Sequence, residues 1–168
     1  CHSAVLDGLD THALELQRMD LADLPEDALQ PPPLRRLHTI NLNFNSLRAL
    51  PDALCTLQSL RALYARGNRL THLPEKIGEL RALQQLWLQD NMLEELPETI
   101  GDMIELSGRV PNAIEPRLAL SGNPLRCPPA DIAALGPAAI GSAFRLARHT
   151  FPAPCGPCLR EWMLGARV

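Results

Sequence analysis

Two cysteines near the C-terminal end of the sequence have the spacing required for redox chemistry. Cys155 and Cys158 are separated by a Gly-Pro dipeptide, and such a pair acts as a thiol–disulfide oxidoreductase when a helix N-terminus lowers the pKa of the first thiol. That arrangement requires a strand before the pair and a helix after it. Only ten residues follow Cys158, and Pro152 and Pro154 disfavour a preceding strand. The sequence therefore argues against thiol exchange.

The same cysteine pair has half of the spacing found in zinc sites. Structural zinc takes four thiolate or imidazole ligands, and His149 and Cys127 are the candidates to complete the set. The sequence contains no second Cys-x-x-Cys or His pair, so we predict no metal site. The five histidines form no catalytic pattern with Ser, Cys or acidic residues, and there is no glycine-rich phosphate loop. We therefore expect a protein that is not an enzyme and that needs no cofactor.

A larger pattern, a unit that recurs every 23 residues, must organise the chain. Asn45, Asn68 and Asn91 mark the units, and each asparagine lies between an apolar L-x-x-L-x-L segment and an L-x-x-L-P segment. The first full unit carries its apolar and turn residues at Leu37, Ile40, Leu42, Leu47, Leu50 and Pro51. A fixed period of this length indicates stacked supersecondary units, so function is expected on a surface of the stack rather than in a closed pocket.

The repeat extends in weaker form on both sides. Upstream, leucines keep the spacing from Leu14 to Leu24, but Met19 occupies the asparagine position. Downstream, the pattern returns from Leu118 to Asn123, which lies 32 residues after Asn91, so nine residues have been inserted.

These residues resemble the leucine-rich repeat family, and within it the cytosolic Ras-suppressor-like branch, whose 23-residue units carry L-P-x-x-I-G-x-L. The resemblance is strongest over residues 34–103. It implies an α/β solenoid of about five repeats with short parallel strands on a concave face. We assign 1–33 to an N-terminal cap and degenerate first repeat, and 34–129 to the repeats, with an insertion at 107–117. Residues 130–168 are assigned to a helical C-terminal cap and a Pro/Cys tail, the cap helix starting near Pro137.

The strand alternation separates scaffold from candidate binding residues. The leucines of each L-x-x-L-x-L segment point inward and form the core, and the resemblance implies that the asparagines bond the backbone at the turns. The outward columns bring Tyr64 and Trp87 together on neighbouring strands, about 5 Å apart. Aromatic and arginine side chains dominate protein interfaces, although aromatic residues also simply cover sheets. The predicted partner-binding residues are Tyr64, Trp87, Arg66, Gln89, Asp90, Arg61, Phe44 and Asn43.

Charge and cysteine content restrict the class of partner and the compartment. Residues 1–33 carry one Arg against seven acidic residues, 34–103 carry eight of each sign, and 104–168 carry seven Arg against four acids. We do not expect nucleic acid as a partner, because binding to its phosphates requires a continuous surface of basic residues. Five cysteines are an odd number, which favours a reduced, cytoplasmic setting. No apolar run approaches the roughly 18 residues of a membrane span.

We therefore expect a protein–protein interaction module, an intracellular scaffold or signalling adaptor that binds a protein partner on its concave face. Because the sequence begins at Cys1 rather than Met, one alternative stays open: a recognition domain of a larger enzyme, such as a kinase or ubiquitin ligase. Neither the partner's identity nor the oligomeric state follows from the sequence.

Overall fold

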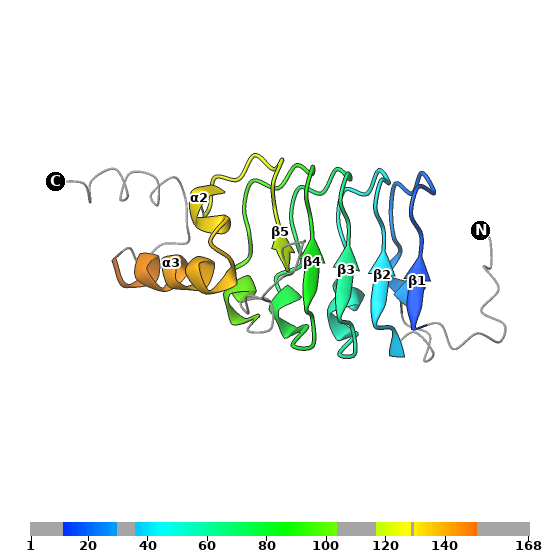
Figure 1. Cartoon of the computed structure of the whole chain (residues 1–168), viewed down its shortest axis with the longest axis horizontal. Coiled ribbons are helices and arrows are strands. Elements are labelled where there is room, and N and C mark those ends of the chain that lie inside the picture. The colour runs from blue at the N-terminus through cyan, green and yellow to red at the C-terminus, as the bar shows by residue number, and fades with distance from the viewer. Residues whose placement is uncertain (1–11, 30–35, 104–116, 129, 151–168) are drawn as a thin grey trace.

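The computed structural model describes residues 12–29, 36–103, 117–128 and 130–150. Five short strands form one parallel sheet in the order β1-β2-β3-β4-β5. Their bounds are Ala13–Glu15 (β1), Thr39–Asn41 (β2), Ala62–Tyr64 (β3), Gln85–Trp87 (β4) and Leu118–Ala119 (β5). Figure 1 shows the strands side by side along the molecule, each contributed by one repeat. The predicted solenoid of short parallel strands is confirmed.

The strand register follows the repeat period. Leu14 pairs with Ile40, Ile40 with Leu63, Leu63 with Leu86, and Leu86 with Leu118. The upstream unit with Met19 is therefore a true repeat, since β1 pairs in register with β2. The predicted insertion at 107–117 lies outside the described residues except for Arg117, and β5 nevertheless pairs with β4 directly.

The segments that return from one strand to the next contain 3-10 helices. They are η1 (Glu26–Leu29), η3 (Asp52–Thr56), η4 (Ile77–Glu79) and η5 (Glu98–Asp102). Pro51 precedes η3 and Pro97 precedes η5, and the backbone of both prolines is extended. This position suits the fixed φ of proline at a helix start. Each helix is three to five residues long, so the stack is held by packing rather than by helix propensity.

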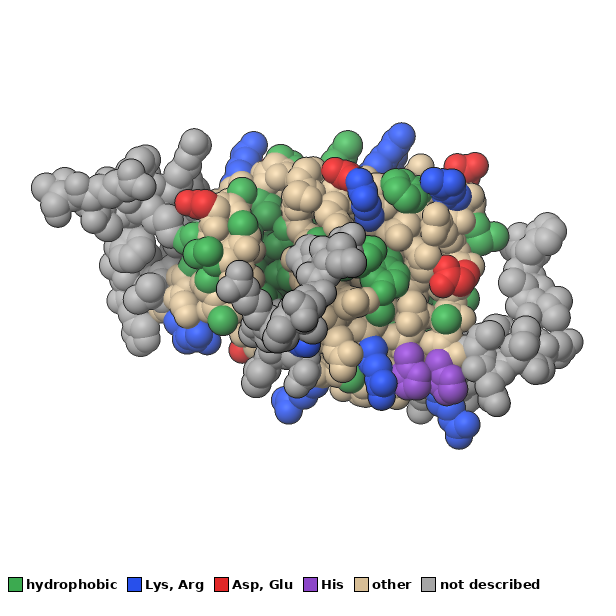
Figure 2. All heavy atoms as spheres, viewed as in Figure 1, with side chains coloured by type: hydrophobic (Ala, Val, Ile, Leu, Met, Phe, Trp, Pro, Cys, Tyr) green, Lys and Arg blue, Asp and Glu red, His purple; other side chains and the backbone are tan. Residues whose placement is uncertain are grey.

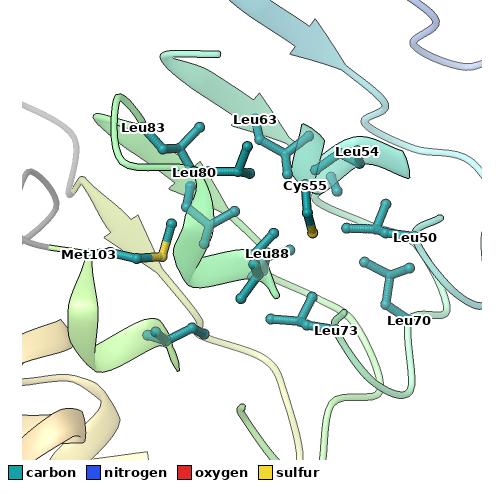
Figure 3. Packing of buried hydrophobic residues seen from close by; sticks show 14 of the residues in the cluster. Leu50, Leu54, Cys55, Leu63, Leu70, Leu73, Leu80, Leu83, Leu88 and Met103 are labelled. Atoms are coloured by element: carbon teal, nitrogen blue, oxygen red, sulfur yellow. The ribbon is translucent and has the colours of Figure 1, made fainter. Parts of the chain in front are cut away.

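The leucine positions of the repeat form one continuous core. Ile40, Leu63 and Leu86 have no exposed surface at the centres of β2, β3 and β4. Figure 3 shows leucines from successive units, among them Leu63 and Leu88, gathered with Cys55 in the interior. Each buried leucine contributes about 1.5–3 kcal/mol relative to exposure, so this apolar column holds the repeats together.

A ladder of asparagines closes the turns after β2, β3, β4 and β5, as predicted. Asn68 accepts a hydrogen bond from the Leu47 N–H at 3.1 Å and donates to the carbonyls of Leu42 and Ala65 at 2.9 and 3.1 Å. Asn91 repeats this arrangement one unit later with Leu70, Ala65 and Leu88. Asn45 and Asn123 bond backbone groups in the same way. The asparagines are scaffold residues, because their amides satisfy buried backbone groups.

Two helices cover the C-terminal end of the stack. The short α2 (Ala130–Ala133) leads into α3 (Pro137–Thr150), which begins at the predicted proline and lies beyond β5 in Figure 1. Helix α3 packs on η5, where Gly141 faces Gly101; a Cβ on Gly141 would lie 2.9 Å from the Gly101 Cα. Ile140 and Phe144 of α3 are buried, so the apolar side of the helix closes the core.

None of the helices in the described ranges has the length and hydropathy required to cross a bilayer.

Candidate partner-binding surface

Tyr64 and Trp87 lie together on the concave face, defined here as the surface of β1–β5 opposite the leucine core. They occupy paired positions of β3 and β4, and their ring centroids are 4.6 Å apart with an interplanar angle of 49°. The neighbouring strand residues Leu63 and Leu86 are fully buried, whereas both aromatic side chains are partly exposed. The predicted aromatic column is therefore present, on the predicted side of the sheet.

Local contacts hold the tyrosine in place. The Tyr64 hydroxyl donates a hydrogen bond to the Gln85 side-chain carbonyl on the next strand. Partial burial raises the pKa of the Tyr64 phenol, with a smaller contribution from the Glu15 carboxylate. The hydroxyl therefore stays protonated at neutral pH and serves as a hydrogen-bond donor.

The next outward row, Asn43, Arg66 and Gln89, follows the aromatic row along the strand direction. The Asn43 side-chain oxygen accepts a hydrogen bond from the Arg66 backbone N–H at 2.8 Å. The Arg66 Nε binds the Asp90 carboxylate at 3.0 Å, and both side chains are about half exposed, at 49% and 53%. Within the described residues, the buried Gln89 Oε1 has no hydrogen-bond partner. This row therefore offers a polar, charged rim beside the aromatic pair.

Phe44 and Asp90 belong to the turn beyond the strands rather than to the strand face. Their φ angles are 56° and 55°, and the residues at the same position of the other repeats, Arg18, Gly67 and Gly122, are also at positive φ. Phe44 is 42% exposed. The Arg18 and Arg66 Cζ atoms lie 5.2 and 5.8 Å from its ring centroid. Sequence reasoning missed Arg18, although it occupies the Phe44 column one repeat earlier.

Arg61 lies apart from the other predicted binding residues. It immediately precedes β3, whereas Arg66 follows the end of that strand, so about 16 Å of extended chain separates them. At that opposite edge the rings of His12 and His38 stack with centroids 4.5 Å apart. Desolvation, followed by the charges of His12 and then Arg61, lowers the pKa of His38. Figure 2 shows the histidines at this edge and cationic side chains at both edges of the sheet.

The structure thus brings together seven of the eight predicted binding residues and leaves Arg61 apart; whether they bind a partner remains a prediction.

The cysteine pair Cys155 and Cys158 lies outside the described residues. Cys127 is buried, as expected for a small apolar residue. In the described part of the chain, no group of three or more His, Cys, Asp or Glu side chains is arranged to hold a metal ion.

Comparison with known proteins identifies the repeats. Residues 35–93 match the family model described as leucine rich repeat. No curated protein sequence matches the chain significantly.

Solved structures share the architecture. The chain is similar to a leucine-rich repeat protein of Leptospira interrogans, with 29% identity over 69% of this chain and 32% of that one, at a TM-score of 0.52. It is also similar to a chain in the BIR3–SERK2 complex of Arabidopsis thaliana, with 29% identity over 74% of this chain and 63% of that one, at a TM-score of 0.54. The chain therefore spans less than two thirds of either relative. The 23-residue period and the asparagine ladder agree with the match of residues 35–93 to the leucine-rich repeat model, and the described chain folds as a leucine-rich repeat solenoid.

Proposed function

We propose that this protein is a non-enzymatic interaction module that binds a protein partner on its concave face. The observation that carries the proposal is the Tyr64–Trp87 pair, because two large aromatic rings stand in contact on the solvent side of a sheet whose other side is a complete core. Aromatic side chains with an arginine beside them have the composition of interface hot spots.

The row beside the pair supports the same function. Arg66 and Asp90 are half exposed, and the turn and strand backbones that carry them are fixed by hydrogen bonds between successive repeats. A partner therefore meets side chains carried on a backbone that is already ordered, which lowers the entropic cost of association.

The resemblance of the units to the Ras-suppressor-like branch supports an intracellular scaffold or signalling adaptor as the biological setting, in the cytoplasm. One structural relative was solved as the BIR3–SERK2 complex, which is consistent with a repeat surface that engages another protein. Because folds of this kind serve many partners, the proposal rests on the surface rather than on the fold.

The test compares partner capture and stability in the same variants. The full chain is used to capture proteins from a cell extract, and the captured partner is then titrated against wild type and the Tyr64→Ala/Trp87→Ala double variant. We expect the double variant to weaken binding by at least about 2 kcal/mol, or about thirtyfold in Kd, while it remains folded. Glu79→Ala, at an exposed position of η4, is the control and should change neither property.

Two results would reject the proposal. If the folded double variant binds as tightly as wild type, the partner surface lies elsewhere on the molecule. If the double variant unfolds, the two rings are part of the stabilising core and cannot be assigned to recognition.

A further inference from the structure

At one turn position every repeat has a left-handed backbone conformation, but only two repeats carry a long or bulky side chain there. Arg18, Phe44, Gly67, Asp90 and Gly122 follow their strands at equivalent positions, and all have φ between 55° and 74°. Glycine adopts this left-handed conformation freely and aspartate tolerates it, but long or bulky side chains are disfavoured there. Arg18 and Phe44 are therefore the two residues at which the repeat keeps a large side chain despite local strain. Strain of this kind is concentrated at functional sites.

The two strained residues contact each other and form one exposed cluster with Arg66. The Arg18 Cζ lies 5.2 Å from the centroid of the Phe44 ring, and the Arg66 Cζ lies 5.8 Å from it. The ring leans over Gly67, where an added Cβ would come within 2.7 Å of the Phe44 Cδ1. Glycine at 67 therefore makes room for the ring. Figure 2 shows hydrophobic surface between cationic side chains at this edge, over β1 to β3.

The guanidinium groups of the cluster keep unused hydrogen-bonding capacity. Arg66 binds Asp90 through its Nε alone, and a guanidinium has five N–H donors. Among the described residues, no carboxylate lies within 4 Å of the Arg18 guanidinium. The nearby Glu15 carboxylate is held by the Asn41 amide at 2.7 Å. The cluster thus presents two cations with free donors around an apolar ring that is 42% exposed.

We propose that the Arg18–Phe44–Arg66 cluster binds an acidic segment of the protein partner. A Glu or Asp carboxylate lies between the two guanidinium groups, and an adjacent apolar side chain packs on the Phe44 ring. Arginine recognises carboxylates through paired N–H donors, and the ring adds an apolar contact that an inorganic anion would not use. Tyr64 is two residues before Arg66 on the same chain, so an extended segment reaches both sites. This inference rests on the proposed function and adds the chemistry of the partner.

The test uses a synthetic peptide that alternates glutamate with phenylalanine, measured by fluorescence anisotropy against the full chain. One comparison peptide replaces glutamate by glutamine, and another replaces phenylalanine by serine. We expect the first peptide to bind and both replacements to weaken binding about tenfold or more. Raising NaCl from about 0.05 M to about 0.5 M shortens the screening length severalfold and should also weaken it.

Matched variants assign the binding to the cluster. Arg18→Gln removes the charge while keeping a polar side chain, and Phe44→Gly removes the ring while suiting the left-handed turn. Each should weaken the Glu/Phe peptide about five- to tenfold. Arg81→Gln, an exposed arginine that follows η4, is the control and should have no effect.

The outcomes separate this inference from the proposed function. Failure of the Glu/Phe peptide to bind, equal binding of the glutamine peptide, or equal binding by Arg18→Gln and Arg81→Gln would each overturn the acidic-segment inference. If Tyr64→Ala/Trp87→Ala abolishes partner capture while Arg18→Gln leaves peptide binding intact, the proposed function holds and the acidic-segment inference is rejected. If Arg18→Gln weakens peptide binding but the aromatic double variant captures its partner normally, the acidic-segment inference holds and the Tyr64–Trp87 binding site is rejected.

Discussion

Replacing Asn68 by alanine tests the asparagine ladder at a position buried between two repeats. Asn68 is 7% exposed, and its side chain is the acceptor for the Leu47 N–H at 3.1 Å. It also donates to the carbonyls of Leu42 and Ala65. The substitution removes these three bonds, together with a longer one to the Arg66 carbonyl at 3.4 Å, and it affects two consecutive units of the stack.

The three bonds differ in how much their loss costs. After the substitution, the Leu42 carbonyl still accepts from the Asn45 amide and the Ala65 carbonyl from the Asn91 amide, each at 2.9 Å. The Leu47 N–H, by contrast, loses its acceptor. An unsatisfied buried donor costs about 1–3 kcal/mol, and each lost but replaceable bond costs about 0.5–1.5 kcal/mol or less. We expect Asn68→Ala to lower the free energy of unfolding by about 2–4 kcal/mol.

Urea unfolding followed by circular dichroism measures this loss directly. Arg69→Ala is the matched control, because Arg69 is exposed and only its backbone N–H bonds the Leu47 carbonyl; its effect should stay within about 0.5 kcal/mol. Asn68→Asp keeps an acceptor for Leu47 but places a carboxylate against two carbonyl oxygens, so it should also destabilise at neutral pH. Equal unfolding midpoints for Asn68→Ala and Arg69→Ala would refute the structural role of the ladder.

Two titratable groups give further predictions. Burial, followed by the Asp52 carboxylate, raises the pKa of the Cys55 thiol to about 11. Native Cys55 should therefore resist alkylation by iodoacetamide at about pH 8, as measured by peptide mapping. Rapid labelling of the native protein would contradict the burial of this thiol. Because the folded state holds this proton more tightly, stability should fall as pH rises from about 9 towards 11, less so in Cys55→Ala. The pKa of His38 is lowered, so its protonation favours unfolding and stability should fall as pH drops through about 6.5. Removing the second cause of that shift with His12→Gln should raise the pKa of His38 in an NMR titration, and an unchanged value would mean that the stacked ring is not a charge neighbour.

The fold was predictable because the repeat period encodes register directly. A shift of 23 residues places Ile40 on Leu63 and Leu63 on Leu86, and the parallel pairing reproduces that alignment. The first repeat was recognisable without its asparagine because the leucine spacing survives around Met19, whose N–H bonds the Asn45 oxygen of the next unit. The conformation of the returning segments was not predictable, since 3-10 helices of a few residues have no apolar period of their own.

The candidate site was only partly predictable. Alternation along a strand assigns a face, and it correctly placed Tyr64 and Trp87 opposite the core. It does not report where a strand ends, so Phe44 and Asp90 were grouped with strand positions although they lie in a left-handed turn. Nor does it show distance along the strand, and Arg61 was therefore grouped with Arg66 although the two lie at opposite edges of the sheet.

The scaffold explains how large side chains persist at the strained turn position. The backbone N–H of Phe44 bonds the Arg66 carbonyl at 2.8 Å, and that of Arg18 bonds the Asn43 carbonyl at 3.0 Å. Asn45, one residue beyond Phe44, anchors the same turn through four backbone groups. Because these bonds set the turn whatever side chain it carries, the position can hold Arg, Phe, Asp or Gly in different repeats. The ladder thus fixes the backbone from inside the stack and leaves the outward side chain free to be selected for recognition.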